Sequence, residues 1–201
     1  MRKGIVLSSI FEKGGTGKST ITYNLAYYLS QKYKVLVIDL DGQSADITYF
    51  MLGEDKLKSR DSMKTIKSVF ENSMTLDNVI LTVKDNLDLI PANTYVTDLS
   101  PAYKTSVFKN IIRRLKEEYD FIFIDVSPSP NHGHVLCLSV TDYLIPITVL
   151  DAACITALMS LDESVYEVQD ASNPKLKYLG IVVNKYDNRT NISKTVLKQL
   201  N

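Results

Sequence analysis

A glycine-rich segment near the N-terminus carries the residue types that cradle a chain of phosphates. It reads K-G-G-T-G-K-S-T, follows a short apolar run and precedes a helical pattern. Its glycines let the backbone curl closely with the N–H groups turned inward, and the following helix N-terminus adds partial positive charge. The strict G-x-x-x-x-G-K-[ST] pattern is not met, because its first glycine falls at Glu12. The segment predicts a nucleotide-binding loop made of Lys13, Gly14, Gly15, Thr16, Gly17, Lys18, Ser19 and Thr20.

Two polar side chains in this loop and two that follow an apolar run are predicted to serve the phosphates and a metal ion. Lys18 is expected to reach the β- and γ-phosphates, and the Ser19 hydroxyl to ligate Mg²⁺. After the run 35–38 come Asp39, expected to hold Mg²⁺ through water, and Asp41, expected to orient the attacking water. Aspartates at a strand end are also common as turn residues, and that alternative stays open.

Two further motifs lie later in the chain. Asp125 follows the apolar run 121–124, which is typical of a Walker B strand whose carboxylate meets the Mg²⁺ hydration shell. Asn184 follows the apolar residues 179–183, and its amide can pair with the N6/N1 edge of adenine. The string N-K-x-D at 184–187 also fits guanine-specific proteins, so GTP is the alternative to ATP.

The four motifs together resemble the ParA/MinD family of deviant Walker A P-loop ATPases, closest to the ParA/Soj-type DNA partition ATPases. The resemblance extends from about residue 4 to residue 200 and rests on Lys13 before the glycine pair, D-x-D-G-Q at 39–43, I-D-V-S-P-S at 124–129 and N-K-Y-D-N-R-T-N at 184–191. Gly42 replaces a family proline, and Val126 with Ser127 replaces Thr-Pro in the segment that responds to the γ-phosphate. Thr48 stands one residue later than the family pattern, and Asp46 is an extra acid.

This resemblance implies an activity and a set of site residues. The family's signature lysine, here Lys13, crosses a dimer interface to the partner's phosphates, so the expected catalytic residues are Lys13, Lys18 and Asp41. Nucleotide binding is expected at the loop and at Asn184, and metal binding at Ser19, Asp39 and Asp125. Lys13 and the aspartate pair favour ATP, so ATP and Mg²⁺ are the expected cofactors and slow, partner-stimulated ATP hydrolysis the expected reaction.

The resemblance also implies partners and a cellular role. These are an ATP-dependent homodimer, a centromere-binding ParB-like protein and non-specific DNA, with no membrane and a cytoplasmic, nucleoid-associated location. The alternative is a MinD-like or other deviant Walker A switch that regulates a protein partner with little hydrolysis. Family members continue past residue 201, so the chain is expected to be either a short member or one lacking a C-terminal extension.

The elements that must position these residues alternate along the chain. Four apolar runs and several helical patterns predict an α/β fold, a doubly wound, mostly parallel sheet flanked by helices, in which ligands sit beyond the carboxyl ends of the strands. No linker or repeat divides the chain, so residues 1–201 are expected to form a single P-loop ATPase domain. Strands are expected at 5–7, 35–38, 79–81, 87–90, 121–124, 143–149 and 179–183, and helices at 19–31, 63–70, 106–119, 155–168 and 192–200.

Two of these helices have a predicted inner face. On 19–31 this face is formed by Ile21, Leu25, Tyr28 and Leu29, and on 106–119 by Val107, Ile111, Ile112 and Leu115.

Composition narrows the classes of function. The 23 basic and 23 acidic residues cancel, so binding to nucleic acid must use a local patch. Residues 175–201 hold six bases against one acid and are the candidate patch. No uncharged stretch is long enough to span a membrane.

Four residues that could do chemistry are expected to have structural roles. Cys137 and Cys154 are expected in the core of a protein from a reducing compartment, since their spacing fits no zinc or disulfide framework. His132 and His134 are expected to be structural or loop residues, because no third ligand or nucleophile stands at a recognisable spacing.

Overall fold

Seven strands pair into one sheet within the part of the chain that the structure describes. The computed structural model describes residues 3–11, 13–54, 62–71, 74–94, 96 and 105–200. The strand order is β3-β4-β2-β5-β1-β6-β8, and β7 with β9 forms a separate parallel pair. The strands are β1 (Ile5–Ser9), β2 (Val35–Asp39), β3 (Leu81–Lys84), β4 (Leu87–Ile90), β5 (Phe121–Asp125), β6 (Tyr143–Leu144), β7 (Ile147–Val149), β8 (Lys177–Tyr178) and β9 (Val182–Asn184).

The middle of this sheet is parallel and ends in register. β5 lies between β1 and β2, and its last residue Asp125 pairs with Ser9 on one side and Asp39 on the other. The adjacent pairs are parallel except β3 with β4 at the edge. The predicted doubly wound, mostly parallel sheet is confirmed.

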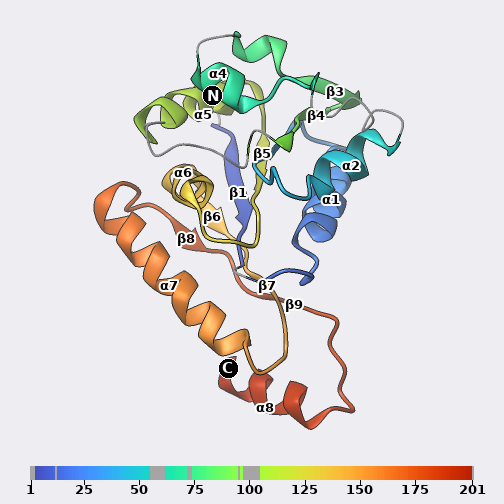
Figure 1. The fold of residues 1–201 in the computed structure, drawn as a ribbon, viewed down its shortest axis with the longest axis vertical. Helices are drawn as coiled ribbons and strands as arrows, with labels where there is room; N and C mark the ends of the chain where they lie inside the picture. Colours follow the sequence, from blue (N-terminus) through green and yellow to red (C-terminus); the bar gives the residue numbers. More distant parts are fainter. Residues whose placement is uncertain are drawn as a thin grey trace.

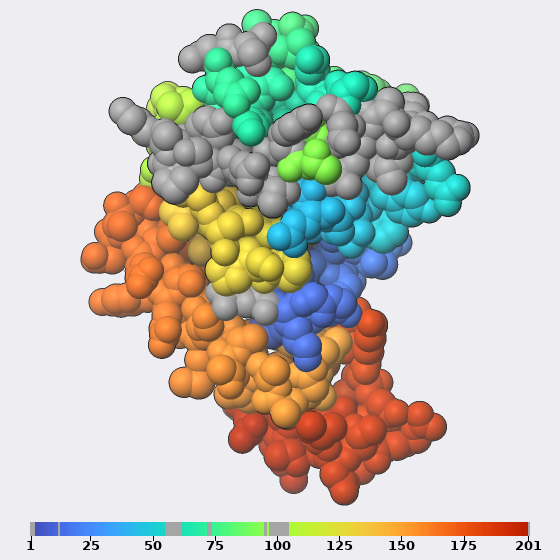
Figure 2. All heavy atoms as spheres, viewed as in Figure 1, coloured from blue at the N-terminus to red at the C-terminus, as the bar shows by residue number. Residues whose placement is uncertain are grey.

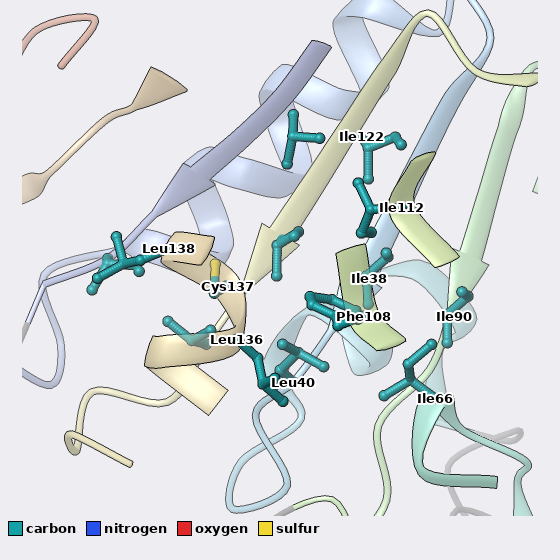
Figure 3. Packing of buried hydrophobic residues seen from close by; sticks show 14 of the residues in the cluster. Ile38, Leu40, Ile66, Ile90, Phe108, Ile112, Ile122, Leu136, Cys137 and Leu138 are labelled. Atoms are coloured by element: carbon teal, nitrogen blue, oxygen red, sulfur yellow. The ribbon is translucent and has the colours of Figure 1, made fainter. Parts of the chain in front are cut away.

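Helices cover both faces of the sheet (Figure 1). In β2, Leu36 and Ile38 pack against α4, α5 and α6, whereas Val35 and Val37 pack against α1 and α2. Figure 3 shows the first cluster, with Phe108 of α5 beside Ile38. The helices are α1 (Lys18–Leu29), α2 (Asp46–Leu52), α4 (Ile66–Phe70), α5 (Thr105–Glu118), α6 (His132–Val140), α7 (Cys154–Ala171) and α8 (Asn191–Leu200), with a 3₁₀ turn at Leu76–Asn78.

The inner face of α1 differs from the predicted one. Leu25 and Tyr28 are exposed by 37% and 75%, and the buried positions are Lys18, Thr22 and Ala26, spaced four apart along one side of the helix. The prediction was right for Leu29, which packs against the core, but the buried positions on this side of α1 belong to Lys18, Thr22 and Ala26. On α5 the same error affects only Val107, which is exposed, while Ile112 and Leu115 are buried as predicted.

The two last predicted strands are each divided. The run 143–149 forms β6 and β7, separated by Pro146, which has no N–H for a strand ladder. The run 179–183 yields only β9, because Gly180 takes φ 155° and β8 ends before it. Leu179 and Ile181 are exposed, so this segment is not covered on both faces as its composition predicted.

Other boundaries moved, and two helices were missed. The helix expected at 63–70 forms only from Ile66, and the strand expected at 79–81 begins at Leu81. Helices α2 and α6 were not predicted, although six of the nine residues of α6 are buried. Cys137 and Cys154 are both buried, as predicted. In the described ranges, no helix combines the length and apolarity that crossing a bilayer requires.

Candidate nucleotide site

The glycine-rich loop lies between β1 and α1, at the carboxyl ends of the central strands. Gly15 and Gly17 take positive φ angles of 72° and 94°, a conformation that other residues rarely adopt. Lys18 opens α1 with its side chain buried, and its Nζ donates to the Lys13 carbonyl at 3.1 Å. Burial lowers the pKa of Lys18, while Asp125 and Asp41 act in the opposite direction. The loop therefore holds one buried cation where phosphates would enter.

Ser19 and Asp125 form the strongest candidate for a metal site. Ser19 Oγ donates to Asp125 Oδ2 at 2.6 Å, and Asp125 Oδ1 is buried with no hydrogen-bond partner among the described residues. Burial, with the charge of Asp39, raises the pKa of Asp125 well above its ordinary value. A buried carboxylate oxygen without a partner beside a serine hydroxyl fits Mg²⁺, which takes few protein ligands and keeps phosphate and water oxygens.

Asp39 is fully buried and occupied by protein donors. Its Oδ1 accepts the Asp41 N–H at 2.8 Å, and its Oδ2 accepts the Thr48 hydroxyl at 2.6 Å and the Thr48 N–H at 3.2 Å. The Thr48 hydroxyl also accepts the Ala92 N–H at 3.0 Å. Burial raises the pKa of Asp39 to about 7. Asp39 thus fastens α2 to the end of β2, and its role toward Mg²⁺ stays a prediction.

Asp41 stands at the wall of the cavity and is held by its own turn. Its Oδ1 accepts the Gln43 N–H at 2.9 Å, and its Oδ2 accepts the Ser44 hydroxyl at 2.8 Å. Asp41 therefore makes turn contacts and also lines the cavity, and its role toward the attacking water stays a prediction. Asp46, the unexplained acid, begins α2 and lines the same cavity.

Lys13 points away from the cavity that its own loop lines. Its Nζ forms an ion pair with Asp151, at the turn between β7 and α7, and Asp151 also accepts the Ala153 N–H at 3.1 Å. Both side chains of the pair are about one third exposed. Within the described residues, Lys13 is not part of the cavity lining, unlike Lys18 and Gly14.

Asn184 and Lys185 close the loop from the other side. Asn184 Nδ2 donates to the Thr16 carbonyl at 2.8 Å, while its Oδ1 accepts the Lys185 N–H at 2.9 Å. Lys185 takes φ 52° and its Nζ donates to the Gly15 carbonyl at 3.0 Å. A side chain at Gly17 would collide with the Asn184 amide. Both ends of this amide serve the protein, so its pairing with adenine stays a prediction.

The structure brings most of the predicted site residues around one cavity of about 490 Å³. Sequence reasoning missed Lys185, although the N-K-x-D string contained it. The segment after β5 also contributes through Val126 and Pro128, and Ser127 joins it to α6 because its carbonyl contacts His134 Nε2 at 2.7 Å. The cavity is lined by Gly14, Gly15, Gly17, Lys18, Ser19, Thr20, Asp41, Gln43, Ser44, Asp46, Val126, Pro128, Asn184 and Lys185.

Comparison with known proteins places this site in a family. A family model described as an AAA domain matches residues 4–178. The chain is 34% identical to an uncharacterised protein of Methanocaldococcus jannaschii, an alignment that covers 98% of the chain and 79% of that protein. It is 27% identical to the sporulation initiation inhibitor protein Soj of Bacillus subtilis, with the same two coverages.

Comparison with solved structures leads to the same family as comparison of sequences. The crystal structure of a plasmid partition protein from Borrelia burgdorferi superimposes with a TM-score of 0.85 at 26% identity, covering 98% of this chain and 85% of that one. The chain belongs to the ParA/MinD family of P-loop ATPases. The predicted fold and family membership are therefore confirmed.

Proposed function

We propose that this chain is a Mg-ATP-dependent, dimerising ATPase of the ParA type that acts in DNA partition. The observation that carries the proposal is the position of Lys13. Its side chain leaves its own cavity and is exposed enough to be withdrawn from Asp151. A cation placed in this way is available to the phosphates bound by a second copy of the chain. In a dimer, Lys13 of each chain would complete the nucleotide site of the other.

The residues around the cavity would divide the work of hydrolysis. Lys18 and the loop N–H groups would hold the phosphates, and Ser19 with Asp125 would hold Mg²⁺, which would offset the negative charge that develops on the phosphoryl group. Asp41, fixed by Ser44, would orient the attacking water. Hydrolysis is expected to be slow until a ParB-like protein stimulates it.

The direct experiment compares assembly with turnover in the full chain. Light scattering with Mg-ATP should show a dimer for the wild type and a weakened dimer for Lys13→Ala, while phosphate release should rise when a centromere-binding partner is added. A matched control is Lys32→Ala, an exposed lysine next to α1. A Lys13→Ala protein that dimerises as well as wild type would refute the role in trans.

DNA binding is proposed for the basic segment that ends the chain. α8 packs on α7 through Val196, at the end of the molecule opposite α4 (Figures 1 and 2). Lys194 and Lys198 stand on the exposed part of α8, and Arg189 precedes it, paired with Asp187. A dimer would present this patch twice, so affinity for DNA should depend on ATP and fall with salt with a slope of about −0.9 per phosphate contacted.

Binding to duplex DNA can be measured by fluorescence anisotropy at several salt concentrations. Lys194→Gln with Lys198→Gln should weaken binding and reduce the salt slope, whereas Glu167→Gln on exposed α7 serves as the control for a surface charge change. Equal binding with ADP and ATP, or no dependence on salt, would contradict this part of the proposal.

A second function is supported by the segment after β5. Val126 lines the cavity where the family has threonine, and Ser127 is fastened by Asn131 Nδ2 at 3.1 Å as well as by His134. A segment held in this way favours a nucleotide-gated switch of the MinD-like kind that recruits a protein partner with little hydrolysis. Phosphate release that no partner or DNA stimulates, together with normal ATP-dependent dimerisation, would select this alternative.

A further inference from the structure

A second hollow lies at the amino ends of the strands, at the other end of β1 from the nucleotide cavity. Its volume is about 370 Å³, and its lining comes from α5, the end of α6, the segment after α7 and Lys3, two residues before β1. None of the residues that line it belongs to the nucleotide site. Its basic side chains are Lys3, Lys109, Arg113, Lys116 and Lys175.

The charge of this hollow is strongly one-sided. The chain as a whole has equal numbers of acids and bases, yet no acid is among the described residues that line the hollow. Asp142 meets Lys116 from outside the lining, at 2.6 Å, and it also accepts the Val6 N–H at 2.8 Å. Four of the five cations therefore have no carboxylate partner in the described part of the chain, and their fields add within one concave surface.

Helix α5 and a hydrogen-bonded turn fix the backbone that carries four of these cations. Lys109, Arg113 and Lys116 share one side of α5, above the buried Ile112. Lys109 Nζ donates to the Ser172 carbonyl at 2.5 Å. Asn173 Nδ2 donates to two carbonyls at the end of α6, both at 2.8 Å, which fixes the turn that presents Lys175. Part of the entropy cost of ordering a binding site is therefore already met by the fold.

The volume of the hollow and its basic side chains together indicate which ligand it could bind. A guanidinium beside several ammonium groups is the combination that proteins use for phosphate oxygens. The hollow is smaller than the nucleotide cavity, and its cations come from three separate segments, the residues before β1, α5 and the turn after α7, around one concave surface. We propose that this hollow is a second anion site that binds a compact polyphosphate, a site independent of the proposed ATPase activity.

The first test uses inorganic pyrophosphate as the probe and calorimetry as the readout. Lys18→Ala in the full chain, with EDTA present, removes the contribution of the P-loop lysine. Adding Arg113→Gln and Lys175→Gln should lower pyrophosphate affinity at least about tenfold. The control is Arg114→Gln, on the same helix but paired with Asp77 outside the hollow, which should leave the affinity unchanged.

Unfolding midpoints should be measured for all variants as a control that the fold is retained. A second test needs no substitution, since saturating pyrophosphate should protect Lys3 and Lys175 of the wild-type chain from acetylation while leaving exposed Lys32 reactive. Absence of pyrophosphate binding at millimolar concentration, affinity that the hollow variants do not change, or loss of duplex DNA binding in those variants without any pyrophosphate effect would each overturn the proposal.

Discussion

The two ends of the sheet differ in the groups that they offer to an anion. At the carboxyl ends, the backbone of one loop and buried groups such as Asp125 and Lys18 form the site, so its geometry is set by main-chain angles and low exposure. At the amino ends, long lysine and arginine side chains on helices and turns form the hollow. The first arrangement can position a reaction, whereas the second can attract an anion without aligning it for chemistry.

The largest effect that would test this contrast is expected from Lys18→Ala, because a chain that no longer binds ATP also loses turnover and ATP-dependent dimerisation. We expect ATP affinity to fall at least about a hundredfold, because the lysine supplies charge-assisted contacts worth roughly 1.5–3 kcal/mol each. Calorimetry with Mg-ATP measures this, and Lys32→Ala is the control. Unchanged ATP affinity would contradict the assignment of this loop as the nucleotide site. Pyrophosphate binding at the amino-end hollow that the Lys18→Ala substitution leaves unchanged would show that the two sites are independent.

The next effect concerns turnover without binding. Asp41→Ala should retain ATP affinity and lower the rate of phosphate release about 10²- to 10⁴-fold, the range for a group that manages proton transfer or water. The ATP-bound dimer should therefore accumulate in light scattering. Ser44→Ala, which removes one hydrogen bond to Asp41, should give a smaller loss in the same direction. A monomeric Asp41→Ala protein with normal turnover would reverse the assigned roles.

A third effect is on stability and depends on pH. The raised pKa of Asp39, about 7 against 3.8 when unfolded, means that the folded chain binds the proton more tightly. Its contribution to the free energy of unfolding is therefore full below pH 4 and is lost as the pH rises to about 7, where the buried carboxylate ionises.

Urea unfolding of the nucleotide-free chain in EDTA, from pH 5 to 8 in steps of about one unit, measures this effect. Asp39→Asn should flatten the difference across that window, and Asp46→Asn should not. Thr48→Val, which keeps the shape but removes both hydroxyl contacts, should destabilise the fold by about 1–3 kcal/mol. Identical pH profiles for wild type and Asp39→Asn would show that burial does not govern this carboxyl.

The smallest effect is expected at the ion pair of Lys13. Asp151→Asn frees the lysine, so the ATP concentration needed for half-maximal dimerisation should fall by no more than about fivefold, because partly exposed pairs contribute about 0.2–1 kcal/mol. Light scattering during an ATP titration measures the shift. Asp170→Asn, an exposed acid near the other end of α7, is the control. A higher ATP requirement would mean that Asp151 orients Lys13 instead of retaining it.

Local patterns in the sequence predicted the parts of this protein that depend on neighbouring residues. The glycine-rich loop, the buried runs of β2 and β5 and the aspartates at their ends were all found where expected, because continuous apolar strands and loop glycines leave a short-range signal. The inner face of α1 was missed, because Thr22 and Ala26 have a weak apolar signal, although they form the side turned to the sheet.

By itself, then, the sequence determined the fold class, the family and most of the residues that line the candidate nucleotide cavity. Only the tertiary structure decided that Asp39 is braced by Thr48, that Lys13 meets Asp151 and that the Asn184 amide closes on Thr16. It also gathered Lys3, the basic face of α5 and Lys175 into one hollow. The three contacts join residues that are 9 to 168 positions apart, and the hollow combines several segments of the chain. Such pairings arise only when the sheet and its helices pack together.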